Sequence, residues 1–174
     1  MDDNFKPRLI CVLPERNRTM FTRKQTLKLE EEFEVDIQNL YEQFCDFQKY
    51  GAHHPVMKTV KIVEDKRPHY VEYEIDEEVL LFGLIRMRPN YKAKVIELEK
   101  HKKLRYTSQV KSYVFLIIDF HFSENNGKTK MVEHIEVNTN LLVAIVFLDI
   151  LKKAHLKVYQ NIKNHFNCPG RINN

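Results

Sequence analysis

The sequence contains very little glycine. Its 174 residues include four, which are Gly51, Gly83, Gly127 and Gly170. A phosphate-binding loop needs several glycines within a few residues, because backbone N–H groups must come close to the phosphate oxygens. Neither a GxGxxG pattern nor a Walker pattern occurs in the chain. Nucleotide binding through either of these loops is therefore excluded.

The sequence also lacks a concentrated basic stripe. Its formal net charge is +4, and Lys and Arg are interleaved with Asp and Glu along most of the chain. Proteins that bind nucleic acid usually carry a basic patch on one face. Residues 1–25 depart from this pattern, because they have few acids and carry Lys6, Arg8, Arg16, Arg18, Arg23 and Lys24. We interpret this segment as a solvated N-terminal extension, and we expect no nucleic-acid partner.

No apolar run approaches the ~20 residues that a membrane-spanning helix needs. The run LLVAIVFLDIL, at 141–151, is interrupted by Asp149 and followed by Lys152 and Lys153. It predicts a buried helix, so we expect no stable insertion into a membrane.

The three cysteines, Cys11, Cys45 and Cys168, form no CxxC pair. An odd number of cysteines without such spacing is typical of a reduced compartment. The apolar segment LICVL near the start is too short for the core of a signal peptide. We therefore expect a cytoplasmic protein, and the sequence indicates no cofactor.

Strict alternation marks the stretch TLKLEEEFEV at 26–35 as a half-buried strand. Its apolar face carries Leu27, Leu29, Phe33 and Val35, and Glu31 interrupts that face. Asp36 then caps a helical segment that ends near Gly51 and Pro55, and the segment is short enough to form two helices in a V. Six strands are predicted next, at 56–64, 69–85, 91–99, 103–110, 113–122 and 128–137. Thr139 or Asn140 caps one long helix that runs to about 166.

This order predicts an α+β fold. Sequential strands joined by tight turns form an antiparallel sheet, here of seven strands, and the turn at NNG is a strong hairpin signal. One face of the sheet is apolar and needs a cover, and the long C-terminal helix is the element large enough to supply it. We expect an extension at 1–25, one domain at 26–167 and a tail at 168–174.

Several local patterns resemble those of the SRPBCC or START-like superfamily, whose domains have the helix-grip fold. The resemblance is carried by FEVDIQNLYEQFCDFQKYGAHHPVMKTVKIVE, by NGKTKMVEHIEV and by the terminal amphipathic helix, and it covers about residues 26–166. It implies an internal cavity for an apolar ligand between the sheet and the long helix. It does not imply an enzyme, because most such domains bind and carry.

The hairpin turn also predicts which residues face inward. Even-numbered residues at 114–122 share a face with odd-numbered residues at 129–137. This face is apolar except for Glu133. The helix-grip arrangement makes the first and last strands neighbours, so Glu31 and Glu133 belong to one wall. Each acid either lies at a rim, pairs with an inward basic group or anchors the polar part of an apolar ligand.

The candidate ligand-binding residues combine these inward acids with the apolar residues around them. They are Glu31, Phe33, Tyr106, Leu116, Ile118, Phe120, Met131, Glu133, Leu148, Leu151 and His155. His155 lies on the apolar stripe of the last helix, where it is either a satisfied core residue or a cavity donor. The pair His53–His54 is interpreted as a loop feature, with a role at the cavity mouth as the alternative.

The outer face of the same hairpin carries Asp119, His121, His134 and Glu136. Such groups can in principle hold a metal, but polar residues are expected on an outer face, and we predict no metal site.

Three functions follow from this sequence. The first is binding or carrying a hydrophobic small molecule, lipid-like or polyketide-like. The second is a cyclase- or hydratase-like enzyme that uses a cavity acid or base, with Glu31, Glu133, Tyr106 or His155 as candidates. The third is a protein–protein module without a ligand. We favour the first, and no catalytic nucleophile is recognisable.

Overall fold

One antiparallel sheet of seven strands forms the body of the protein, in the order β1-β9-β8-β7-β6-β3-β2. The computed structural model describes residues 22–81, 84–111 and 114–167. The strands of this sheet are β1 (Thr22–Phe33), β2 (Met57–Lys66), β3 (Tyr70–Glu77), β6 (Asn90–Glu99), β7 (Lys103–Lys111), β8 (Val114–Asn125) and β9 (Lys128–Asn140). The other elements are α1 (Ile37–Cys45), α2 (Phe47–His53), the hairpin β4 (Val79–Leu81) and β5 (Ile85–Met87), and α3 (Leu141–Asn167). The predicted helix-grip architecture is confirmed.

The β8–β9 hairpin turns at Asn126 and Gly127, as the sequence predicts. Both residues have positive φ, 52° and 74°, which is the conformation that a two-residue turn of this kind requires. Asn125 and Lys128 close the ladder around the turn. The predicted inward face is also confirmed, because the even residues of β8 and the odd residues of β9 are buried.

The first and last strands are neighbours, with Leu29 opposite Glu133 in the register. The first strand starts earlier than predicted, because Thr22 to Gln25 pair with the end of β9. It also ends earlier, at Phe33, since its partner β9 begins at Lys128. Of the predicted extension at 1–25, residues 1–21 lie outside the described residues. The predicted tail at 168–174 lies outside them as well.

The single strand predicted at 69–85 is wrong. The chain leaves the sheet after Glu77 and forms the separate β4–β5 hairpin. Two backbone hydrogen bonds hold the chain in this path. The N–H of Glu77 donates to the carbonyl oxygen of Pro89 at 3.0 Å, and the N–H of Glu78 donates to that of Val56 at 2.8 Å. These bonds replace the partners that a continuing strand would need.

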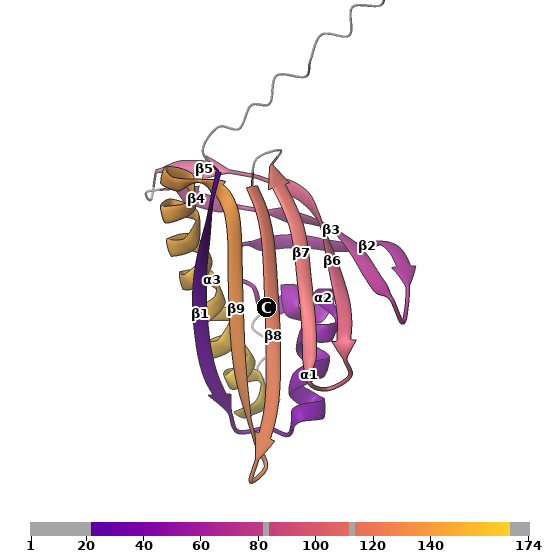
Figure 1. Cartoon of the computed structure of the whole chain (residues 1–174). Helices are drawn as coiled ribbons and strands as arrows, with labels where there is room; N and C mark the ends of the chain where they lie inside the picture. Colours follow the sequence, from indigo (N-terminus) through magenta and orange to yellow (C-terminus); the bar gives the residue numbers. More distant parts are fainter. Residues whose placement is uncertain (1–21, 82–83, 112–113, 168–174) are drawn as a thin grey trace, which may run out of the picture.

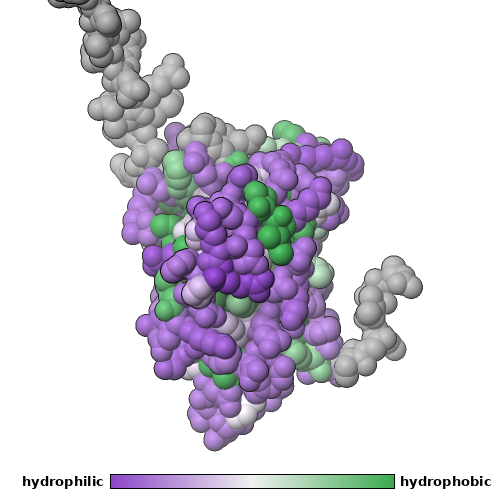
Figure 2. Space-filling view, turned by 90° about the vertical axis from the view of Figure 1, so that its right-hand side faces the viewer, coloured by the Kyte–Doolittle hydropathy of each residue, from purple (hydrophilic) through white to green (hydrophobic). Residues whose placement is uncertain are grey.

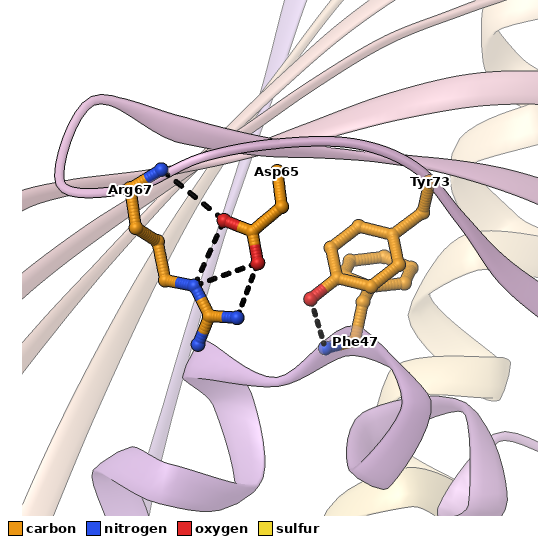
Figure 3. A network of polar contacts seen from close by, with 4 residues as sticks. All are labelled: Phe47, Asp65, Arg67 and Tyr73. Atoms are coloured by element: carbon orange, nitrogen blue, oxygen red, sulfur yellow. Dashed lines mark hydrogen bonds and ion pairs between the residues drawn. The ribbon is translucent and has the colours of Figure 1, made fainter.

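Helices α1 and α2 form the predicted pair. The side chain of Asp36 accepts from the N–H of Asn39 at 3.0 Å and caps α1, and Asp46 caps α2 in the same way. Figure 3 shows how α2 meets the sheet: the hydroxyl of Tyr73 accepts a hydrogen bond from the N–H of Phe47 at 3.4 Å, beside the Asp65–Arg67 pair of the β2–β3 hairpin. The helix pair is thereby held to β3.

Helix α3 lies on the same side of the sheet as α1 and α2 and runs down from the end at which β4 and β5 lie (Figure 1). Its predicted stripe faces the sheet, with Ala144, Val158 and Ile162 fully buried. Within the described residues no helix is long and apolar enough to cross a membrane.

Strand β2 is one of the two edges of the sheet, and β1 is the other. Figure 2, which faces the β2 side of the molecule, shows a mainly hydrophilic surface with a hydrophobic patch in its upper half and smaller hydrophobic areas elsewhere. Strand β2 exposes Ile62 and Val63 between charged side chains such as Lys61, Glu64 and Lys66. Charges on an edge strand oppose pairing with another chain.

Candidate functional site

A cavity of about 430 Å³ lies between the sheet, the β4–β5 hairpin and the first half of α3. Its wall is almost wholly aliphatic and aromatic. The lining residues are His54, Val56, Glu77, Val79, Met87, Pro89, Tyr91, Val110, Val114, Leu116, Val143, Val146, Phe147, Ile150, Leu151 and Ala154. Two of them, Met87 and Val143, are more than one third exposed, so the cavity reaches the surface at this end.

The cavity exists because the two layers separate at the hairpin end. The chain leaves the sheet after Glu77, and β4–β5 reaches across to the start of α3 in its place. On α3 the residues that face this space include Val143, Val146 and the small Ala154 beside larger residues such as Phe147 and Leu151. They do not fill the gap, whereas aromatic residues close the other end.

Polar groups gather at the inner end of the cavity. His54, Glu77 and Tyr91 line the large cavity and also a second, smaller one of about 30 Å³. The hydroxyl of Tyr91 donates to the Oε1 atom of Glu77 at 2.8 Å. The imidazole of His54 is only 6% exposed, and neither of its ring nitrogens has a hydrogen-bond partner among the described residues.

Burial perturbs all three groups. It raises the pKa of the Glu77 carboxyl, an effect that the Tyr91 hydroxyl partly opposes. It lowers the pKa of His54 to about 3, and the neighbouring His155 adds to this shift. Burial also raises the pKa of Tyr91 well above its ordinary range. Each shift favours the uncharged form of its group.

Glu133 lies elsewhere, in the packed core behind the smaller cavity. It is fully buried, and its Oε1 atom is 2.7 Å from Nδ1 of His155 while its Oε2 atom accepts from the hydroxyl of Tyr159. The other nitrogen of His155 is 3.5 Å from the hydroxyl of Tyr50. Both carboxylate oxygens therefore have partners on α3, and the group ties that helix to β9.

Glu31 is on the neighbouring strand, as predicted, but it is not in the cavity. Its register partner is Met131, one inward position away from Glu133. Its Oε1 atom is 2.5 Å from Nζ of Lys163, and both side chains are about one third exposed. Of the alternatives for this acid, the structure matches the rim position and the basic partner.

The predicted site residues separate into two groups. The residues that line one or both cavities are Tyr106, Leu116, Ile118, Leu151 and His155. The others lie outside the described cavity walls. Phe33, Phe120 and Met131 are fully buried in the core, Leu148 is partly buried against it, and Glu31 and Glu133 have the partners given above.

Glu77, Tyr91 and Tyr159 were missed. Glu77 continues the inward alternation of Val71, Tyr73 and Ile75, and Tyr159 follows His155 at helical spacing, so the sequence carries a signal for these two. His54 lies directly after α2, in the loop where the sequence placed it, and its side chain lines the cavity wall. The ring of His53 packs against that of His165 at 5.2 Å.

The outer face shows ordinary surface pairing. Asp119 accepts from Arg105 at 2.6 and 2.8 Å, and the rings of His121 and His134 are 5.7 Å apart. In the part of the chain that the structure describes, no three metal-ligating side chains come together.

Similarity to known proteins is found at the level of the fold. No family model matches the sequence, and no curated protein matches it. Solved structures do match. The aromatase/cyclase Zhui from Streptomyces sp. R1128 superposes with a TM-score of 0.69 at 10% identity, over 86% of this chain and 100% of that one. A START superfamily protein from Mycobacterium smegmatis gives 0.64 at 12% identity, over 80% and 95%.

Ara h 8.0201 matches as well, with a TM-score of 0.66 at 14% identity, over 82% of this chain and 97% of that one. At such low identity these matches show the fold alone. The protein has the helix-grip fold that these solved structures share.

Proposed function

We propose that the protein binds a hydrophobic small molecule, lipid-like or polyketide-like, in the cavity between the sheet and α3. The observation that carries this proposal is the cavity itself, of about 430 Å³ and with an almost wholly apolar wall. Protein interiors pack as densely as organic crystals, so a space of this size is not a normal packing defect. Its volume and lining are those of small-molecule sites.

The neighbours support the same proposal. They include an aromatase/cyclase and a START superfamily protein, which share the layered arrangement that creates the space. Tyr106, Leu116, Ile118, Leu151 and His155 remain in the proposed contact set, and Val114, Val146 and Phe147 join it from the wall. Phe120 packs against Tyr106 at a ring distance of 4.7 Å, whereas Phe33 and Met131 belong to the packed core.

The test is a substitution on α3 that places a large side chain in the cavity. Ala154 is small, buried and in the cavity wall, whereas Leu156 lies two residues on and is 41% exposed. We expect Ala154→Phe to lower the affinity for a fluorescent lipid at least tenfold, with Leu156→Phe as the matched control that leaves it unchanged. Native mass spectrometry of the purified wild-type protein should show a bound apolar molecule. Equal affinities for wild type and Ala154→Phe would overturn the proposal.

An enzymatic function is the second candidate, and Glu77 is the observation that favours it. A buried carboxyl whose pKa is raised by burial is suited to take part in proton transfer to a bound molecule. If the protein is a cyclase- or hydratase-like enzyme, wild type should convert the bound molecule and Glu77→Gln should not. Mass spectrometry of the extracted ligand measures the conversion. A carrier returns the ligand unchanged from both proteins.

A further inference from the structure

His54 is the most unusual polar group in the molecule. It is 6% exposed, and its Nδ1 and Nε2 atoms have no partner among the described residues. A neutral imidazole has one donor and one acceptor, and leaving such groups unpaired inside a protein costs about 1–3 kcal/mol each. The ring lies in the wall of both cavities. Its hydrogen-bonding capacity is thus directed at cavity space.

The surroundings of His54 define what it can bind. Rings of Tyr50 and His155 lie 5.7 and 5.9 Å from it, and Glu77 and Tyr91 are in the same stretch of wall. Among the described residues that line the two cavities, none is a lysine or an arginine. A ligand carboxylate or phosphate would therefore be buried without a cation, which is costly.

The hydrogen-bonding groups of the wall also fit a cationic head poorly. An ammonium group has three donors and no acceptor, so it cannot pair with the N–H of a neutral His54 ring, and the Oε1 atom of Glu77 already accepts from Tyr91 at 2.8 Å. A hydroxyl fits both nitrogens of the ring, because it donates one hydrogen bond and accepts others without charge.

We propose that His54, together with Glu77 and Tyr91, forms a head-group site that selects apolar ligands ending in a neutral hydroxyl, such as long-chain alcohols. This inference rests on the proposed function, since the apolar part of the ligand occupies the large cavity. The hydroxyl accepts from one ring nitrogen of His54 or donates to the other, and the Glu77 carboxyl completes its partners. The apolar chain then extends toward Val146 and Met87.

The experiment compares three competitors of equal chain length: 1-decanol, decanoate and decylammonium. Each displaces the neutral fluorophore N-phenyl-1-naphthylamine from wild type, His54→Phe and His53→Phe at pH 7. We expect decanol to bind wild type about tenfold more tightly than either ion. His54→Phe should weaken decanol about fivefold to tenfold relative to the fluorophore, whose own affinity is measured directly for each protein, and this change is the loss of one hydrogen bond. His53→Phe is the matched control, because its ring lies against His165 instead.

The outcomes separate the two proposals. Failure of wild type to bind the fluorophore or any competitor would overturn ligand binding itself. Binding of all three competitors with equal strength, or a decanol affinity unchanged in His54→Phe, would overturn the head-group site and leave the cavity function intact. If His54→Phe does not fold, ¹⁵N spectra of the wild-type histidine rings decide. Decanol should shift the His54 ring nitrogens and the fluorophore should not, and unshifted nitrogens would overturn the inference.

Discussion

The two halves of α3 cover the same sheet in opposite ways. In the second half Val158, Tyr159 and Ile162 are buried to within 1%, and the ring of Tyr159 meets that of Phe33 edge-on at 6.1 Å. In the first half Val143 and Ile145 are 36% and 59% exposed, and the inward residues border open space. One helix therefore serves as a core element at one end and as a cavity wall at the other.

The difference comes from what faces each half. Aromatic side chains from α1, β1 and β8 fill the closed end, and the rings of Phe44 and Phe120 are 5.2 Å apart there. The open end faces aliphatic residues and the small β4–β5 hairpin. The closed end also contains the Glu133 network, whose hydrogen bonds are satisfied within the protein, whereas His54 at the open end has none. Tight packing and the proposed binding cavity thus lie at different ends of one layer.

The largest effect is expected from breaking the closed end at Glu133. Replacing Glu133 with Ala leaves His155 and Tyr159 buried without their shared acceptor, so we expect a loss of about 3–5 kcal/mol in the free energy of unfolding. The matched control is Glu31→Ala on the neighbouring strand, whose partly exposed pair with Lys163 should contribute no more than about 1 kcal/mol. Urea denaturation of both variants measures the contrast. Similar losses would contradict the division between core and rim.

Truncating one apolar residue at each end compares the packing directly. Ile162 is fully buried, while Leu151 is partly exposed beside existing space. The cost of such a truncation includes the cavity it creates, so we expect about 4 kcal/mol for Ile162→Ala and about 2 kcal/mol for Leu151→Ala. Thermal melts of the two variants give the order. If the Leu151→Ala variant melts at the same temperature as wild type, α3 does not pack against the sheet at this position.

Acid should destabilise the open end through His54. Its folded-state pKa, about 3, is below the unfolded value of 6.5, so the unfolded chain binds more protons between these pH values. Stability from this group is complete above pH 6.5 and falls as the pH drops toward 3, by about 2 kcal/mol at pH 5. His54→Phe should lose this part of the pH dependence. Parallel unfolding curves at pH 5 and pH 7.5 for both proteins provide the measurement.

The smallest effect is expected on the outer face, which belongs to neither end. His121 is exposed, so His121→Ala should change the unfolding free energy by less than about 0.5 kcal/mol. The same variant, and treatment with a chelator, should leave fluorescent-lipid binding unchanged. Loss of binding in either case would support a metal site on the outer face of the sheet, at Asp119, His121 and His134.

Much of the fold was predictable because its signals are local. The period of two in β8 and β9 assigned every inward residue correctly, and the Asn126–Gly127 turn set their register. The apolar stripe on α3 was also predicted, from its helical spacing. The β4–β5 hairpin was not, because backbone hydrogen bonds from Glu77 and Glu78 to distant residues end β3, and no local pattern encodes them.

The candidate site was predicted only in part. Leu116, Leu151 and His155 were found because they lie on inward faces, but an inward position does not distinguish core from cavity wall. Phe120 and Met131 have the same periodicity and are buried in tight packing. The distinction depends on the volumes of side chains from several elements that meet at one point.

The sequence by itself determined the order of elements, the antiparallel pairing and the apolar faces, because propensity and periodicity act over a few residues. Tertiary structure alone decided where the layers separate, which partners Glu31 and Glu133 receive, and that His54 lies unpaired in a cavity wall. Burial and pairing of a charge depend on groups that are far apart along the chain, such as Glu31 and Lys163. The pairing of β1 with β9 and the packing of α3 against this sheet bring those groups together, and no single segment of the sequence determines either.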